Sequence, residues 1–249
     1  MRLDEQPYKV SFGVRVARPI LRFIVRLITR TLMRITITGI ENVPLGQTYL
    51  VAPNHISLFD GPIAIAFWPE TVEVMGASDI WNKPGQNLLA RWYGAIKVHR
   101  GQYDRELIDS VLKVLRSGRP LLLAPEGGRS HVPGLRRAKP GVGFLIDAGQ
   151  VPVIPVGLSG TTEDMFSLGL RGKRPLVTMR IGKPLELPPI QGQGAERRLA
   201  RQQYADLVMA HIAGLLPEDY RGVYAGEAIV QEVPPEAPRR MEEFHAPQG

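Results

Sequence analysis

Apolar runs of strand length alternate along this chain with segments whose apolar residues recur at helical spacing, and this alternation constrains the fold more than any other feature. We expect strands at 35–40, 48–52, 72–75, 95–98, 121–124, 153–158 and 177–181. We expect helices at 57–68, 86–93, 105–115, 141–148 and 196–215. Alternation of this kind is typical of a parallel sheet, because parallel neighbours need a crossover connection. The sequence therefore predicts an α/β fold with a mostly parallel central sheet flanked by helices.

The segment ahead of the first expected strand, at about 11–34, is rich in arginine. Its arginines recur at steps of three or four among apolar residues, at Arg15, Arg18, Arg22, Arg26, Arg30 and Arg34. This spacing predicts an amphipathic helical segment. Because Pro19 is best tolerated in a first helical turn, we expect a break near Arg18 and a second helix that runs to about Arg34.

This segment lacks the stretch of about 20 largely uncharged residues that a membrane-spanning helix needs. We therefore expect it to lie on a membrane surface, as a peripheral or monotopic attachment. The alternative is a helix that packs on its own domain and leaves its arginines in solvent.

The positive charge of the chain is concentrated at its N-terminus. Residues 1–40 hold eight basic and two acidic side chains, whereas the rest of the 249 residues contributes only +1 to the net charge of +7. This distribution argues against a nucleic-acid groove spread over the domain and indicates a local anionic partner, such as a membrane surface with anionic lipid. The chain has no cysteine, which excludes disulfides, thiolate metal ligands and a cysteinyl acyl-enzyme.

A histidine and an aspartate lie five positions apart where the second expected strand gives way to a helix, at His55 and Asp60. A histidine that removes a proton from a hydroxyl must keep one tautomer and one orientation, which a carboxylate on its far nitrogen provides. Since five residues is not a helical-face spacing, a turn must bring the two groups together. We expect Ser57 to cap the helix, which places Asp60 in the first turn with its side chain directed back toward His55.

A second polar loop, Pro125-Glu126-Gly127-Gly128-Arg129-Ser130, follows another buried strand pattern. Sites in open α/β sheets collect at strand ends, so we expect the two loops to meet. The other histidines show no metal-ligand spacing, and we expect no metal and no cofactor.

Four blocks of this sequence, in order, resemble the glycerolipid acyltransferase family, and most closely its bacterial 1-acylglycerol-3-phosphate (lysophosphatidate) acyltransferases. The blocks are Asn54-His55-x-Ser57-x-x-Asp60, Gly94-Ala95-Ile96-Lys97-Val98-His99-Arg100, Pro125-Glu126-Gly127-Gly128-Arg129-Ser130 and Val151-Pro152-Val153-Ile154-Pro155-Val156. The resemblance covers roughly residues 35–187. Three departures are Gly128, where the family usually has Thr or Ser, Ala124, where it usually has an aromatic or aliphatic residue, and His99, where it usually has an acid.

The resemblance implies that His55 and Asp60 are the catalytic pair and that Arg100, Glu126, Gly127 and Arg129 shape the acceptor site. An arginine fork suits a phosphate monoester. We interpret Glu126 as a residue that orders Arg129 or bonds a glycerol hydroxyl, since a carboxylate repels phosphate. Lys97 is a further candidate for phosphate contact, ranked below Arg100.

The implied reaction is transfer of a fatty acyl group from acyl-ACP or acyl-CoA to the free hydroxyl of 1-acylglycerol 3-phosphate, which makes phosphatidic acid. Neutral His55 would act as general base, with no covalent enzyme intermediate. The alternatives are another lysolipid, glycerol phosphate or a glycolipid as acceptor, or a non-catalytic membrane-binding module.

The expected organisation has three parts. Residues 1–34 form the amphipathic membrane-surface segment, 35–224 the acyltransferase domain, and 225–249 a disordered tail rich in proline and mixed charge. The expected location is the cytoplasmic face of the cell membrane.

Overall fold

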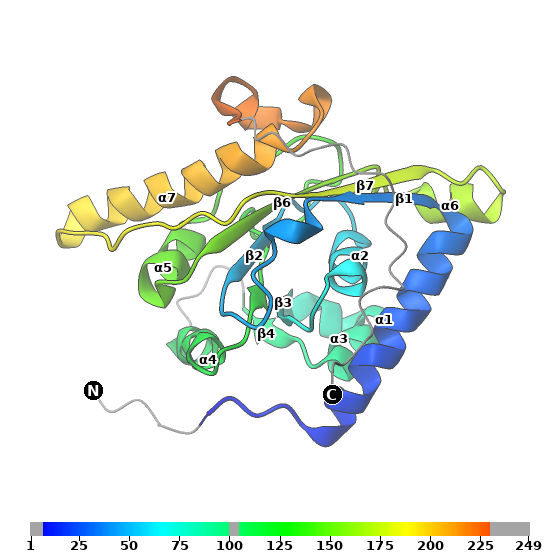
Figure 1. Ribbon diagram of the computed structural model, residues 1–249, viewed down its shortest axis with the longest axis horizontal. Helices are drawn as coiled ribbons and strands as arrows, with labels where there is room; N and C mark the ends of the chain where they lie inside the picture. The colour runs from blue at the N-terminus through cyan, green and yellow to red at the C-terminus, as the bar shows by residue number, and fades with distance from the viewer. Residues whose placement is uncertain (1–6, 100–104, 230–249) are drawn as a thin grey trace.

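Seven strands form one sheet in the computed structural model of this protein, which describes residues 7–99 and 105–229. The strands are β1 (Arg34–Thr38), β2 (Leu50–Pro53), β3 (Glu73–Ala77), β4 (Ile96–Val98), β5 (Leu121–Leu122), β6 (Val153–Ser159) and β7 (Leu176–Ile181). Their order across the sheet is β1-β7-β6-β2-β5-β3-β4, and every neighbouring pair is parallel except β6 and β7. The predicted α/β class with a mostly parallel sheet is confirmed (Figure 1).

Helices cover both faces of this sheet. They are α1 (Phe12–Leu32), α2 (Asp60–Phe67), α3 (Gln86–Tyr93), α4 (Arg105–Arg116), α5 (Pro140–Gly149), α6 (Met165–Leu170) and α7 (Gly194–Gly214), with short 3₁₀ turns η1 (Ile40–Asn42), η2 (Ser78–Asn82), η3 (Glu218–Tyr220) and η4 (Gly222–Glu227). Figure 1 shows α4, α5 and α7 on one side and α1, α2 and α3 on the other.

The side-chain alternation of the strands builds two cores. Tyr49 and Val51 face the side of α1 and α2, whereas Leu50 and Ala52 face the side of α5 and α7. Because both faces of β2 are covered, all four of its residues are buried, as the continuous apolar run predicted.

The N-terminal helix differs from the prediction in one respect. The expected break near Arg18 is wrong, because α1 is a single helix of 21 residues that contains Pro19. Proline removes one backbone donor, yet the helix continues through Pro19 and packs against α2 and α3.

Three arginines of α1, Arg18, Arg22 and Arg26, point toward the protein, whereas Arg15 and Arg30 are exposed. Arg22 and Arg26 donate hydrogen bonds to the backbone carbonyls of Trp68 and Ala66, next to the C-terminal end of α2. The helix also exposes seven large apolar side chains: Phe12, Val16, Ile20, Phe23, Ile24, Leu27 and Ile28. We call this set the apolar face of α1. The alternative of a helix that packs on its own domain is confirmed as to packing, since α1 contacts α2 and α3, but Arg22 and Arg26 bond to the protein and are not left in solvent.

A buried ion-pair network fastens α1 to the sheet. Glu73, the first residue of β3, is fully buried and accepts two hydrogen bonds from Arg18, at 2.8 and 2.5 Å. Tyr8 and Arg119 donate to the same carboxylate at 3.1 and 3.0 Å, while Arg18 Nε also donates to the carbonyl of Tyr93. A buried carboxylate is tolerated because its oxygens are paired in this way.

Among the described residues, no helix combines the length and hydrophobicity that crossing a bilayer requires. The expected tail begins at residue 225. The described part of it, residues 225–229, completes η4 and ends with Ile229, whose N–H donates to the carbonyl of Ala210. Residues 230–249 lie outside the described residues.

Candidate active site

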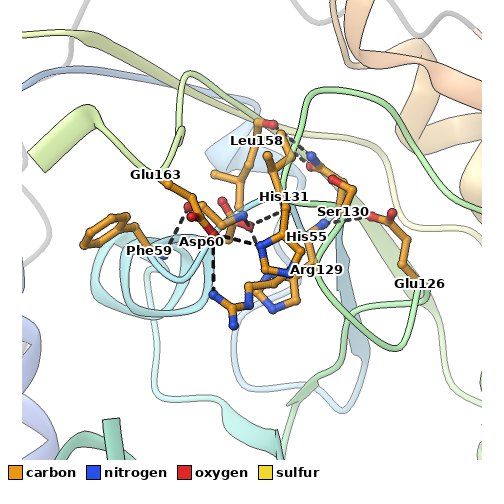
Figure 2. A network of polar contacts seen from close by, with 12 residues as sticks. His55, Phe59, Asp60, Glu126, Arg129, Ser130, His131, Leu158 and Glu163 are labelled. Carbon is orange, nitrogen blue, oxygen red and sulfur yellow. Dashed lines mark hydrogen bonds and ion pairs between the residues drawn. The ribbon is translucent and has the colours of Figure 1, made fainter. Parts of the chain in front are cut away.

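The two polar loops singled out in the sequence meet at one edge of the sheet. Strand β2 lies between β5 and β6 and runs parallel to both, so the segments that follow the three strands emerge at the same edge. The loop after β2 carries His55, the loop after β5 carries Glu126 to Ser130, and the loop after β6 carries Glu163 (Figure 2).

His55 and Asp60 contact each other as the geometric argument predicted. Nδ1 of His55 lies 2.9 Å from Oδ2 of Asp60, and a carboxylate only accepts, so Nδ1 carries the proton and Nε2 is left as the basic nitrogen. The Asp60 side chain is 1 % exposed, whereas that of His55 is 22 % exposed. Asp60 therefore holds the imidazole from the protein interior, while the imidazole itself is accessible to solvent.

The turn between the pair is built by Asp60 and not by Ser57. Oδ2 of Asp60 also accepts the backbone N–H groups of Ile56 and Ser57, at 2.6 and 2.8 Å. The expectation that Ser57 caps the helix is wrong: α2 begins at Asp60 after the N-cap Phe59, and the Ser57 hydroxyl accepts only the N–H of Phe59. The carboxylate at the helix start satisfies donors outside the helix and still faces the positive end of the helix dipole.

Asn54 fixes the loop on the side of β6. Its buried amide group donates to the carbonyl of Leu158 at 2.9 Å and accepts the N–H of Leu158 at 2.6 Å. These two hydrogen bonds continue the connection between β2 and β6 beyond the last paired residue of β2, Pro53. They fix the direction of the backbone at the start of His55.

Glu126 holds the backbone of His55. Its carboxylate is buried and accepts the N–H of His55 at 2.8 Å and the N–H of Arg136 at 2.9 Å. Burial raises the pKa of the Glu126 carboxyl above its usual value, against the opposing effect of these backbone donors. The loop that carries Glu126 forms a third hydrogen bond, in which the N–H of Ser130 donates to the carbonyl of His55 at 2.9 Å.

Gly127 and Arg129 lie on the same loop. Gly127 adopts a left-handed φ of 64°, and a Cβ at this position would come within 2.7 Å of the Lys139 side chain. Glycine therefore allows a tight turn that presents Arg129 beside the catalytic loop. Arg129 Nη1 forms an ion pair of 3.7 Å with Oε1 of Glu163.

The remaining candidates are Lys97 and Arg100. Lys97 lies on β4, the edge strand of the sheet, and its Nζ is 5.9 Å from the centroid of the Trp81 ring. The structure does not bring Lys97 into the network around His55 that Figure 2 draws. Arg100 lies outside the described residues, so its place in the acceptor site stays a prediction.

Two residues of this network were missed from the sequence. His131 donates from Nδ1 to Oε1 of Glu163 at 2.9 Å, and its backbone N–H donates to the carbonyl of Ile56. Nothing in the local sequence marks Glu163, which is 108 positions from His55. The only available signal was that β6 could neighbour β2, which would place the residues after both strands together.

The arrangement fits proton transfer from a hydroxyl. A base of fixed tautomer with an open Nε2, an acid that keeps it oriented, and a guanidinium on the adjoining loop can together hold an anionic alcohol and remove its proton. The hydrogen bonds that Glu126 and Ser130 form with its backbone hold His55 in place.

Comparisons with known proteins give the family and the fold of the chain. Residues 34–159, half of the chain, match the model of the family described as Acyltransferase. A putative 1-acyl-sn-glycerol-3-phosphate acyltransferase of Caenorhabditis elegans is 29 % identical over 113 residues, which are 44 % of this chain and 43 % of the relative. A 1-acyl-sn-glycerol-3-phosphate acyltransferase of Borreliella burgdorferi is 27 % identical over 134 residues, 53 % of each chain. This protein thus spans about half the length of the curated relatives that it matches.

The fold is also that of a solved structure. The crystal structure of the 1-acyl-sn-glycerophosphate acyltransferase PlsC from Thermotoga maritima superposes with a TM-score of 0.58 at 22 % identity, over 78 % of this chain and 77 % of that one. At this identity the likeness establishes the fold alone.

Proposed function

Because this chain belongs to the acyltransferase family, we propose that it transfers a fatty acyl group from a thioester, acyl-ACP or acyl-CoA, to the free hydroxyl of 1-acylglycerol 3-phosphate, with phosphatidic acid as product. The observation that carries the proposal is the buried Asp60 carboxylate on Nδ1 of a partly exposed His55. Relatives in two distant organisms that bear the name of this activity support the choice of acceptor.

The reaction proceeds by direct transfer. His55 Nε2 takes the proton of the acceptor hydroxyl while the oxygen attacks the thioester carbonyl. The tetrahedral intermediate then expels the thiolate, to which His55 returns the proton. Asp60 stays ionised throughout and stabilises the imidazolium that forms between the two steps.

Arg129 receives the phosphate of the acceptor in this proposal. Its guanidinium presents paired N–H donors that match a phosphate, and the next residue, Ser130, is bonded to the backbone of His55. Glu126 acts indirectly, since both of its oxygens accept hydrogen bonds from backbone N–H groups. It positions His55 and the loop, and does not contact the acceptor.

The enzyme works at a membrane surface, on the cytoplasmic face where acyl-CoA and acyl-ACP are found. The apolar face of α1 supports this location, because soluble proteins seldom leave so many large apolar side chains together in solvent. The exposed Leu88, Leu89 and Trp92 of the neighbouring α3 add to it. Attachment through apolar side chains replaces the arginine attachment expected from the sequence.

The test is an assay of the purified full chain with 1-acylglycerol 3-phosphate and either acyl-CoA or acyl-ACP. We expect release of one free thiol for each phosphatidic acid formed, with both products quantified. Glycerol 3-phosphate, a lysophospholipid with a larger head group and monoacylglycerol serve as competing acceptors. Thiol release without an acylated acceptor, or no release with any acceptor, would contradict the proposal.

A further inference from the structure

The ion pair between Glu163 and Arg129 places a negative charge where the proposed function needs a positive one. Oε1 of Glu163 lies 3.7 Å from Nη1 of Arg129 and 2.9 Å from Nδ1 of His131 (Figure 2). An acceptor phosphate that binds to Arg129 therefore meets a carboxylate of like charge at the same guanidinium.

The backbone that carries Glu163 is fixed at both ends. Gly160 has a left-handed φ of 80°, and a Cβ there would come within 2.0 Å of the carbonyl of Leu176 on β7. The N–H of Gly160 also donates to the hydroxyl of Tyr220. Met165, on the other side, is buried in the core. The carboxylate is thus held near the site by its backbone while its side chain, 55 % exposed, can turn away.

The distances show that Glu163 does not hold Arg129 in place. Its hydrogen bond goes to His131, whereas the contact with Arg129 exceeds hydrogen-bond length. His131 is itself fixed, since its N–H donates to the carbonyl of Ile56, and it adopts a left-handed φ of 65°. Glu163 therefore affects Arg129 through charge, as a competitor for it.

We propose that Glu163 is a specificity residue of the acceptor site, which competes with the acceptor's phosphate for Arg129 and so penalises head groups in proportion to their negative charge. The proposal rests on the proposed function, in which Arg129 receives that phosphate. A dianionic phosphate monoester is affected most, a phosphodiester less and an uncharged glyceride least. The residue contributes nothing to the proton transfer at His55.

The test compares Glu163→Gln with the unaltered enzyme in two measurements. The first is the affinity for glycerol 3-phosphate by calorimetry, with no donor present, so that it needs no turnover. We expect binding about two- to fivefold tighter, the range for an exposed charge pair. The second is steady-state acylation, in which the KM for 1-acylglycerol 3-phosphate falls by a similar factor while kcat and the KM for monoacylglycerol stay unchanged.

Asp164→Asn is the matched control, because it removes the same charge one residue along the same exposed loop. It should alter neither measurement. Unchanged or weaker binding of glycerol 3-phosphate by Glu163→Gln would overturn the inference, as would an equal gain from Asp164→Asn. The proposed function fails separately, when the unaltered enzyme acylates no acceptor.

Discussion

His55 is restrained through its side chain, its N–H and its carbonyl, by Asp60, Glu126 and Ser130. Three bonds from three different positions leave the imidazole little freedom to leave the geometry that proton transfer requires. At the scale of the residue, the orientation of His55 thus depends on both the segment after β2 and the loop after β5.

Replacing His55 with alanine should remove the base without disturbing its surroundings, since the backbone bonds of residue 55 remain. We expect kcat to fall by about 10²- to 10⁴-fold, the usual contribution of a positioned acid–base group. Thiol release under saturating substrates measures the loss, and thermal unfolding should show little change. Near-normal turnover would remove His55 from the mechanism.

Glu126→Ala tests the positioning of His55 by its backbone. The backbone N–H groups of His55 and Arg136 would lose their buried acceptor, which costs about 1–3 kcal/mol of stability. Urea denaturation measures this cost, and kcat should fall further than the KM for the acceptor rises. Glu126→Gln keeps one acceptor oxygen and should recover part of both. A selective rise in acceptor KM, with stability unchanged, would instead assign Glu126 to direct binding.

Helix α7 is tied to α5 by a buried carboxylate. The side chain of Asp147 is 1 % exposed and accepts hydrogen bonds from Arg197 and Arg201 on α7, at 2.7 to 3.0 Å. Burial alone raises the pKa of Asp147, but the two guanidinium groups outweigh it and hold that pKa below its usual value of 3.8. At the scale of elements, this contact between α5 and α7 completes the core on their side of the sheet.

Asp147→Asn should lower the free energy of unfolding by about 1–3 kcal/mol at pH 7. A depressed folded-state pKa contributes stability above the unfolded value of 3.8, and this contribution is lost as the pH falls through the folded pKa. The difference between the two proteins should therefore shrink below pH 3.8 in denaturation curves. Arg198→Gln, an exposed neighbour, should cost less than about 0.5 kcal/mol. A difference independent of pH would contradict the ionic role.

At the scale of the whole molecule, the apolar face of α1 is the surface through which we expect the protein to contact lipid. Phe23→Glu with Leu27→Glu should weaken binding to liposomes at least tenfold, because burial of each side chain contributes about 1.5–3 kcal/mol. Flotation with neutral vesicles and with anionic vesicles should show the loss in both.

Arg15→Gln serves as the control for charge, since Arg15 is an exposed arginine of the same helix. Its effect should be small, limited to anionic vesicles and abolished by salt. The opposite result, in which only the arginine change releases the protein, would restore the electrostatic attachment.

The strands and the contact between His55 and Asp60 could be predicted from the sequence because both depend on local patterns. Apolar runs gave the strands their positions, and the turn residues around His55 and Asp60 made their contact geometrically reasonable. The orientation of α1 could not be predicted in this way, because periodicity defines two faces but not which one is buried. The deciding partner, Glu73, is 55 positions from Arg18. Glu163 was missed for the same reason.

The network at Glu73 has a consequence for the proposed attachment of the protein to a bilayer. Peeling α1 from the sheet would pull the Arg18 guanidinium away from the buried Glu73 carboxylate and leave that carboxylate without its main partner. Helix α1 therefore does not move independently of the sheet. On the proposed attachment, α1 and His55 move as one body, so the depth of α1 in the lipid would also set the height of His55 above it.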